Sequence, residues 1–304
     1  MKIGVATVIT DEGIRPDVLA KALEDRGFDS LVVAEHSHVP SSRATPFPAG
    51  GELPREYYRS YDPFVALTAA AVATSELLIG PGVLLLPQRD SIQTAKAISS
   101  LDQISAGRVM LGLGLGWNLE EAADHGVAAT MRGQLLDEKL AAMKELWAND
   151  EAEFHGRYVD FDATYCWPKP AQKPHPRIYF GGFTAATVSR ARRHHGGWMP
   201  MAVPVADMVP AQLSLLEGAT DIPVSVIVPE NVEPDVLDAY RRHGAERALI
   251  LLSTKSESET LRLLDRIAAH TETQLNRCSL ANALWCSHFQ GRSQRVMQNR
   301  RAIL

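Results

Sequence analysis

Short apolar runs alternate with longer stretches of helical spacing along most of the chain. The short runs are continuous and rich in β-branched residues, a pattern typical of buried parallel strands. They predict strands at Ile3–Ile9, Ser30–Ala34, Leu77–Leu86, Val109–Leu113, Arg177–Phe180, Trp198–Met201, Pro223–Val228 and Ala248–Leu252.

A helix is predicted after each strand. Proline opens several helices, where its missing N–H costs nothing, and glycine closes others. The predicted helices are Pro16–Gly27, Pro63–Thr74, Ser91–Ser105, Met131–Trp147, Thr184–His195, Ala206–Leu216, Pro234–His243 and Ser256–Ala268. Long connections at residues 37–62 and 114–130 and a hairpin excursion at 151–176 interrupt this alternation.

The repeated strand–helix unit predicts an α/β fold. Right-handed crossovers of eight such units close most naturally into a (β/α)8 TIM barrel with inserted loops, and a doubly wound open sheet is the alternative. We assign residues 1–270 to a single barrel domain. Residues 271–304 form an atypical C-terminal tail, because from Thr273 onward the chain has no Asp or Glu and no clear period.

Composition narrows the possible partners. The net charge of -5 and pI of about 6.1 provide no basic face for nucleic acid. No stretch reaches the roughly 18 apolar residues of a membrane span. The three cysteines are too few for a disulfide framework, so we expect a cytoplasmic protein that acts on a small molecule.

A Glu-His pair follows the second predicted strand. In a barrel, catalytic residues lie where strands end, and His36 directly follows this strand, next to Glu35. A histidine there can hydrogen-bond a cofactor ring or carry a proton, although it can also simply cap the strand. We predict no metal site, since His36 and His38 lack a third ligand at a clear spacing.

Glycines cluster at the ends of three other predicted strands. Gly80 and Gly82 flank Pro81, which indicates a bulge or a close approach of a ligand to the backbone. The run 112–116 alternates glycine with leucine, and we expect it to let a flat ring lie against the barrel mouth. Gly181 and Gly182 open a helix, where backbone N–H groups favour a phosphate.

Taken together, these segments make the chain resemble the luciferase-like monooxygenase superfamily. The resemblance rests on the order and spacing of several motifs over residues 1–270. They are LVVAEH (31–36), YDPFVAL (61–67), LIGPGVLLLP (78–87), LDQISAGR (101–108), GLGLGW (112–117), FHGRY (154–158), Lys169-Pro170 and YFGG (179–182). Within the superfamily the chain is similar to the actinobacterial subgroup that uses coenzyme F420, a deazaflavin.

The resemblance implies a cofactor in the barrel mouth and a homodimer. It assigns catalytic roles to His36 and Glu35, with His36 also contacting the cofactor. It places a non-proline cis peptide at Gly82–Val83 behind the ring. The residues that it implies for cofactor binding are His36, Gly82, Val83, Leu85, Leu115 and Gly116 near the ring, and Gly181, Gly182, Phe183 and Met201 near the phosphate.

Some positions depart from the family pattern. The turn before strand six reads His195-Gly196-Gly197-Trp198 where Gly-Asp-Gly-Trp is usual. Trp117 and Asn118 stand where sugar-phosphate dehydrogenases of the superfamily carry an acidic residue. The hypotheses are therefore an F420-dependent oxidoreductase with an unknown small organic substrate, an FMN-dependent monooxygenase, and a barrel that binds a cofactor without catalysis.

Overall fold

The computed structural model describes residues 1–201 and 214–269. The chain divides into two compact units, Met1–Thr260 and Leu261–Leu304, and the fold below is that of the first. Residues 261–269 of the second unit are helical. The predicted tail, 271–304, lies outside the described residues, as does most of the predicted helix Ala206–Leu216.

Parallel strands form a closed ring in the first unit. The strands are β1 (Lys2–Thr7), β2 (Ser30–Val33), β3 (Leu78–Pro81), β4 (Met110–Leu113), β7 (Arg177–Gly181), β8 (Gly197–Met199), β9 (Ser225–Pro229) and β10 (Arg247–Leu252). They pair in the orders β3-β2-β1-β10-β9 and β4-β7-β8. Parallel bridges Ile79–Val109 and Trp198–Val224 join the two sheets at both edges. The predicted (β/α)8 barrel is thereby confirmed.

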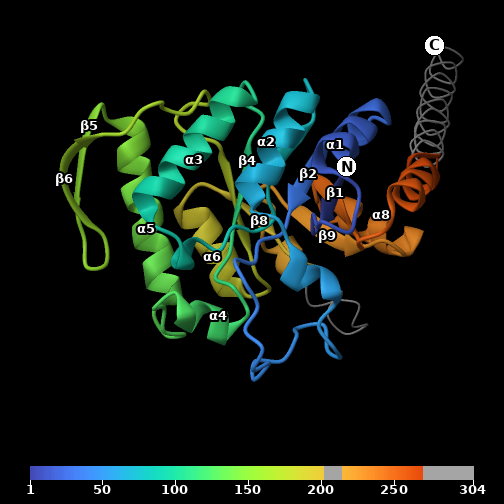
Figure 1. Cartoon of the computed structure of the whole chain (residues 1–304), viewed down its shortest axis with the longest axis horizontal. Helices are drawn as coiled ribbons and strands as arrows, with labels where there is room; N and C mark the ends of the chain where they lie inside the picture. The colour runs from blue at the N-terminus through green and yellow to red at the C-terminus, as the bar shows by residue number, and fades with distance from the viewer. Residues whose placement is uncertain (202–213, 270–304) are drawn as a thin grey trace, which may run out of the picture. The chain divides into compact units, whose positions relative to one another are not determined.

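Helices follow the strands around this ring (Figure 1). The described α-helices include α1 (Pro16–Asp25), α2 (Pro63–Ala73), α3 (Ser91–Ile104), α4 (Leu119–Asp124), α5 (Arg132–Ala148), α6 (Ala185–Arg193) and α8 (Pro234–Arg242), with 3-10 turns η1 (Arg55–Arg59) and η2 (Leu86–Gln88). Local chemistry explains their starts. Asp62 accepts hydrogen bonds from the first turn of α2, and Asp90 does the same for α3.

The third strand is shorter than predicted. β3 ends at Pro81, and the predicted strand extended to Leu86. The chain changes partner here: the Gly82 N–H still bonds Val33 on β2, whereas the Leu84 N–H bonds Gly112 on β4 at 2.8 Å. The turn η2 follows at once, so the continuous apolar run covers a strand, a crossing segment and a 3-10 turn.

Two apolar layers hold the barrel together. Inside the ring, side chains from successive strands pack on one another, namely Ala6, Val32, Met110, Tyr179, Met199, Ile227 and Leu249. Outside it, strand residues such as Leu111 and Phe180 pack against α3 and α5 through Ile98 and Leu140. This burial of apolar surface on both faces explains why the strands read as continuous apolar runs.

The predicted excursion at 151–176 contains an antiparallel hairpin. Strands β5 (Glu151–His155) and β6 (Asp160–Tyr165) pair beside α5, away from the ring (Figure 1). The remaining insertions follow β2 and β4. Since these strands are parallel, both insertions lie at the same, carboxyl-terminal end of the barrel, where the candidate site is found.

Candidate functional site

His36 is held between two partners at the end of β2. Its side chain is buried, and Nδ1 lies 2.7 Å from Oε2 of Glu121. On the other side, the Trp117 indole N–H donates to Nε2 at 3.2 Å. An indole nitrogen can only donate and a carboxylate can only accept, so the neutral ring carries its proton on Nδ1 and offers a lone pair at Nε2.

Glu121 is the fully buried carboxylate that sets this arrangement. It lies in the first turn of α4, where the side chain of the N-cap residue Asn118 accepts from the Glu121 N–H at 3.0 Å. Its second oxygen accepts from the Ser37 N–H at 3.0 Å. The helix start therefore aims a charged acceptor back at the strand end that carries His36.

Glu35 points to the opposite side of the same strand end. It accepts from the Leu85 N–H at 2.5 Å and from Arg89 Nε at 2.5 Å. Burial raises the pKa of Glu35 above its ordinary value, and the Arg89 guanidinium acts in the opposite direction. Arg89 also bonds Asp62 at 3.2 Å and lies 5.0 Å from the centre of the Phe64 ring. Glu35 thus joins the end of β2 to the segment after β3.

Aromatic rings from the two insertions surround His36. The centroids of Tyr57 and Trp117 each lie 5.6 Å from the imidazole centroid. Phe47 packs between them, with centroids 5.1 Å from Tyr57 and 5.8 Å from Trp117. Burial raises the pKa of Tyr57 to about 12, so its hydroxyl stays protonated at neutral pH. The insertion 37–62 therefore covers the histidine with apolar surface.

The predicted cis peptide bond between Gly82 and Val83 is present. Val83 projects toward the glycines of β4 and β7. A Cβ at Gly181 would lie 2.8 Å from Val83 Cγ1, and a Cβ at Gly114 would overlap Val83 Cγ2. Part of the space that these glycines leave is therefore filled by the Val83 side chain.

Leu85, Leu115 and Gly116 lie together beside this segment. Leu85 is buried, and a Cβ at Gly116 would lie 3.7 Å from one of its methyl groups. Gly116 has φ +76, which favours glycine. The side-chain amide nitrogen of Gln88 is buried nearby without a hydrogen-bond partner among the described residues. Leu115 packs against the outer core cluster.

The predicted phosphate residues lie on β7, α6 and after β8. Gly181 ends β7, and Gly182 has φ +137 and accepts a hydrogen bond from Trp198 Nε1 at 2.8 Å. Phe183 is exposed just before α6. Met201 pairs with Ile227 and contacts the cluster inside the barrel, and the residues that follow it are outside the described part of the chain.

Ser37 connects the buried pair to the surface. Its hydroxyl lies 3.3 Å from Oε1 of Glu121 and 2.7 Å from Nε2 of His125. It also lies 2.9 Å from Nδ1 of His38, whose Nε2 contacts Asp124 at 2.9 Å. The Ser37 hydroxyl therefore links the exposed His38 and His125 to the buried Glu121 by hydrogen bonds.

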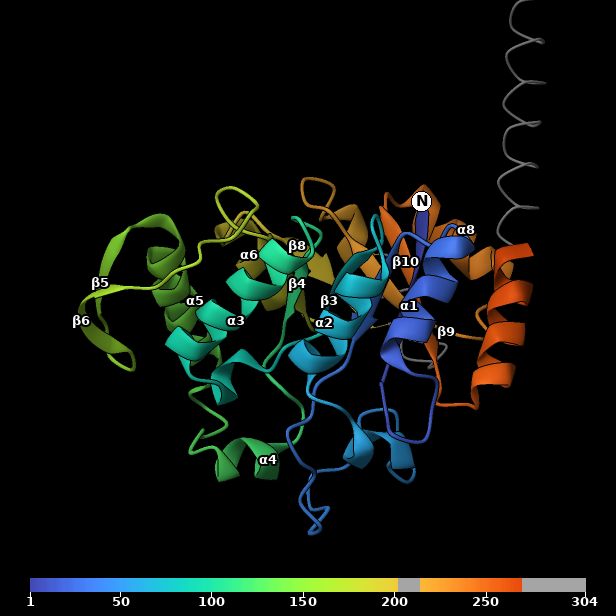
Figure 2. The same cartoon turned by 45° about the horizontal axis from the view of Figure 1, so that its top comes forward.

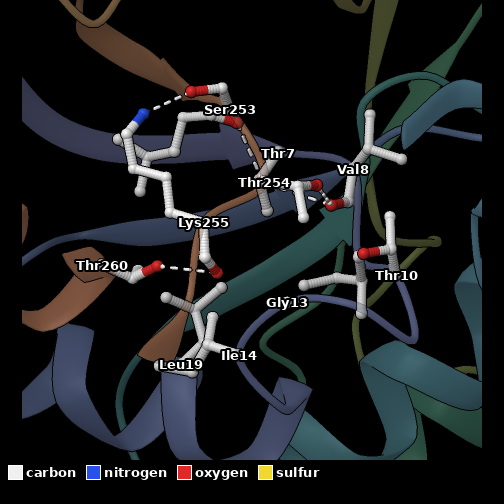
Figure 3. Close-up of a pocket in the computed structure, with 12 residues that line it drawn as sticks. Thr7, Val8, Thr10, Gly13, Ile14, Leu19, Ser253, Thr254, Lys255 and Thr260 are labelled. Carbon is white, nitrogen blue, oxygen red and sulfur yellow. Dashed lines mark hydrogen bonds between the residues drawn. The ribbon is translucent and has the colours of Figure 1, made fainter. Parts of the chain in front are cut away.

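A separate small cavity lies at the carboxyl ends of β1 and β10 (Figure 3). Thr7, Val8, Leu252 and Thr254 border it, and the Thr254 hydroxyl lies 3.5 Å from the Val8 carbonyl oxygen. Its volume of about 20 Å³ has room for a water molecule and none for a cofactor.

The structure brings the predicted residues of strands two to four together and adds three that sequence reasoning missed. Glu121, Trp117 and Arg89 were not predicted as site residues. The pattern Asn118-x-x-Glu121 marks a helix start, and that signal could have located the carboxylate. Nothing in the sequence pairs it with a histidine 85 residues away.

Comparison with known proteins decides the family. The model of the family described as luciferase-like monooxygenase matches residues 17–219, more than half of the chain. The chain belongs to the luciferase-like monooxygenase family. It is thereby placed among oxidoreductases, in agreement with the resemblance seen in its motifs.

Curated relatives carry different cofactor names. An uncharacterized protein of Mycobacterium tuberculosis, Rv0953c, is 33% identical over 276 residues, 88% of this chain and 98% of the relative. The F420-dependent hydroxymycolic acid dehydrogenase of the same organism is 30% identical over 67% of this chain and 54% of its own length. An FMNH(2)-dependent dimethylsulfone monooxygenase from Pseudomonas putida is 30% identical over 41% of this chain and 35% of its own length.

Solved structures show the same fold. Monooxygenase RslO1 from Streptomyces bottropensis superposes with a TM-score of 0.73 at 20% identity, covering 90% of this chain and all of that one.

Within the described residues of our chain, no helix is both long and apolar enough to cross a membrane.

Proposed function

We propose that the chain is an F420-dependent oxidoreductase that transfers a hydride between the deazaflavin and a small substrate bearing a hydroxyl group or the corresponding carbonyl. The observation that carries this proposal is the state of His36. Glu121 and Trp117 together hold it with a lone pair at Nε2, the atom that a substrate hydroxyl would need as its proton acceptor.

The residues around His36 fit a cofactor of this kind. His36, Gly82, Val83, Leu85, Leu115 and Gly116 would contact the ring. Gly181, Gly182, Phe183 and Met201 would hold the phosphate. At the start of α6 the N–H groups of Ala185 and Ala186 have no acceptor within the helix, whereas that of Thr187 is capped by Thr184, and Phe183 before them is exposed. The buried Gln88 amide, which lacks a partner among the described residues, is a donor available to a ring carbonyl.

When bound, a deazaflavin would supply or accept the hydride, and residues of this chain would move the proton. His36 Nε2 takes the proton of the substrate hydroxyl, in the place that the Trp117 N–H holds in this structure. The imidazolium that results is stabilised by the Glu121 carboxylate at Nδ1. Glu35 and Arg89 hold the strand end, and the rings of Phe47 and Tyr57 keep water away.

An FMN-dependent monooxygenase is the second candidate. The name of the family and the FMNH(2)-dependent relative favour it, although that match covers less of the chain than the match to the F420-dependent relative. The cofactor phosphate would use the same residues in both cases. The third candidate is a barrel that binds a cofactor without catalysis. The contact between His36 and the buried Glu121 carboxylate argues against it, because such a pair is suited to accept a proton.

Reduction of F420 by a panel of short secondary and primary alcohols tests the reaction. We expect a loss of F420 absorbance with at least one alcohol. His36→Ala should abolish turnover, because the acceptor of the proton is gone, whereas His155→Ala, on an exposed histidine of the hairpin, should not. Turnover with FMNH2 and oxygen in place of F420 would favour the second candidate.

We also propose a homodimer that covers the outer face of α2. This helix is apolar almost all round, with the sequence PFVALTAAAVA, yet Val65 and Val72 are 68% and 72% exposed. Ile104 on the neighbouring helix α3 is half exposed as well. A helix of this kind is normally buried. Val65→Lys with Val72→Lys should convert a dimer into a monomer in sedimentation velocity, and a wild-type monomer would refute the proposal.

A cytoplasmic location completes the proposal. The buried thiol of Cys166 is free, as expected in a reducing compartment. Cell fractionation that recovered the protein with the membranes or outside the cell would contradict this assignment.

A further inference from the structure

A second cavity, of about 380 Å³, lies at the amino-terminal end of the barrel. The residues that line it stand at the starts of strands: Lys2 on β1, Leu78 on β3, Met110 on β4, Arg177 on β7 and Arg247 on β10. Since His36 follows the end of β2, the cavity and the candidate catalytic site lie at opposite ends. Figure 2 shows the N-terminus and the insertion after β2 on opposite sides of the strands.

Arg247 is the buried charge of this cavity. Its side chain is 5% exposed, and three of its five N–H groups are engaged. Nε donates to Asp29 at 2.5 Å, and Nη1 donates to Ser225 at 3.0 Å and to Glu246 at 3.1 Å. The two N–H groups of Nη2 donate to none of the described residues, and Nη2 is not shut off from solvent. They are therefore open to the space that Arg247 borders.

The carboxylates near Arg247 are already used. Glu246 accepts from the Tyr179 hydroxyl at 2.6 Å and lies 3.5 Å from Arg177 Nη1. Asp29 bonds Arg247 and, at 2.9 Å, Lys2 Nζ. Three cations, Lys2, Arg177 and Arg247, thus face two carboxylates, which leaves one positive charge in excess.

Lys2 and Arg177 form the rim of the cavity. The side chains of Lys2 and Arg177 are 65% and 59% exposed, so both can turn toward a group that enters. Beside the charged groups, Leu78, Met110 and the ring of Tyr179 provide apolar lining, and Gln172 is the neutral polar residue next to them. A volume in this range is typical of small-molecule sites, and the mixture of an apolar wall with a buried guanidinium selects for charge as well as shape.

We propose that this cavity is a binding site for a small organic oxyanion, a carboxylate or phosphate whose apolar part packs on Met110 and Tyr179. The oxyanion accepts from Nη2 of Arg247, and Lys2 and Arg177 complete the contact. The site is separate from the cofactor residues and does not depend on the proposed reaction.

Isothermal titration calorimetry of the full-length protein at low salt tests the site, with phenyl phosphate, inorganic phosphate and phenol as probes. We expect phenyl phosphate to bind more tightly than inorganic phosphate, because only the former uses the apolar wall, and phenol not to bind. Lys2→Gln with Arg177→Gln should weaken phenyl phosphate binding by about tenfold, since both are exposed and neither holds the core.

Two controls locate the ligand. Arg15→Gln with Lys21→Gln removes the same charge from two exposed positions that do not line the cavity, the N-cap of α1 and a residue within α1, and should leave the affinity unchanged. His36→Ala should also leave it unchanged. The proposal is overturned if no oxyanion probe binds, if the α1 variant loses as much affinity as the rim variant, or if His36→Ala abolishes binding.

Discussion

The ion pair between Glu35, at the end of β2, and Arg89 allows a test of how this part of the site is stabilised. The Glu35 side chain is 4% exposed and that of Arg89 is 23% exposed. Arg89→Met keeps most of the packing against Phe64 and removes the charge. Removal of one partner of a buried pair costs about 3–5 kcal/mol, and partial exposure of Arg89 sets our expectation at the lower end, about 3 kcal/mol at pH 7.

The pH dependence follows from the direction of the Glu35 shift. Burial raises the pKa of Glu35 in the folded protein, and the loss of Arg89 raises it further. A group whose folded pKa is raised contributes stability below its unfolded pKa and loses this contribution as the pH rises through the folded pKa. Up to the folded pKa of Glu35 in the wild type, both proteins lose this stability at the same rate. Above it only Arg89→Met continues to lose stability, so the gap in unfolding free energy should widen by up to about 1.4 kcal/mol per pH unit until the higher folded pKa of the variant is reached.

Urea denaturation at several pH values between 5 and 8 measures this gap. Glu35→Gln with Arg89→Met should recover much of the loss, because no buried charge is left unpaired. Arg55→Met, which breaks an exposed pair with Glu12, is the matched control and should leave the midpoint unchanged at every pH. A deficit of Arg89→Met that is the same at pH 5 and pH 8, or a double variant no more stable than the single one, would refute the reasoning.

Further predictions concern the other contacts of the site. Glu121→Gln should lower turnover with F420 about 100-fold or more while the cofactor still binds, because the imidazolium loses its counter-charge; steady-state kinetics beside a binding titration separate the two effects. Trp117→Phe should remove the donor to His36 Nε2, so the ¹⁵N shift of Nε2 should move toward that of an acceptor nitrogen without a hydrogen bond, while Glu121 keeps the proton on Nδ1. An unchanged spectrum would exclude the hydrogen bond. Gly114→Ala should destabilise the fold by about 1–3 kcal/mol in chemical denaturation, since its Cβ overlaps Val83, and Val83→Ala should restore the loss; no rescue would mean that Val83 is elsewhere.

Hydrophobic pattern was sufficient for the eight strands and the α/β class, and it favoured the barrel while leaving a doubly wound open sheet as the alternative. The β-branched runs and the proline or aspartate starts of helices are local signals, and they placed most elements close to their observed bounds. They failed at residues 82–86, where the apolar run persists while the backbone changes from β2 to β4 as partner. A hydrophobic pattern records burial and carries no information on such a change.

The site was only partly accessible from the sequence. His36 could be found because it directly follows a strand, and the Gly82–Val83 bond through the family resemblance. Glu121 follows β4 and His36 follows β2, so their contact joins segments 85 residues apart and exists only in the folded chain. Gly114 was interpreted as space for a ring and Gly181 as part of a phosphate site, and the structure adds a second reason for both glycines, the methyl groups of Val83.

The most direct test of the account is a titration of the purified full-length protein with F420 and, separately, with FMN, followed by quenching of tryptophan fluorescence. Trp117 contacts His36 and Trp198 contacts Gly182, so a ligand held by the proposed residues should quench both. We predict saturable quenching by F420 at concentrations well below those needed for FMN. Preferential binding of FMN, or no binding of either, would contradict the proposed cofactor.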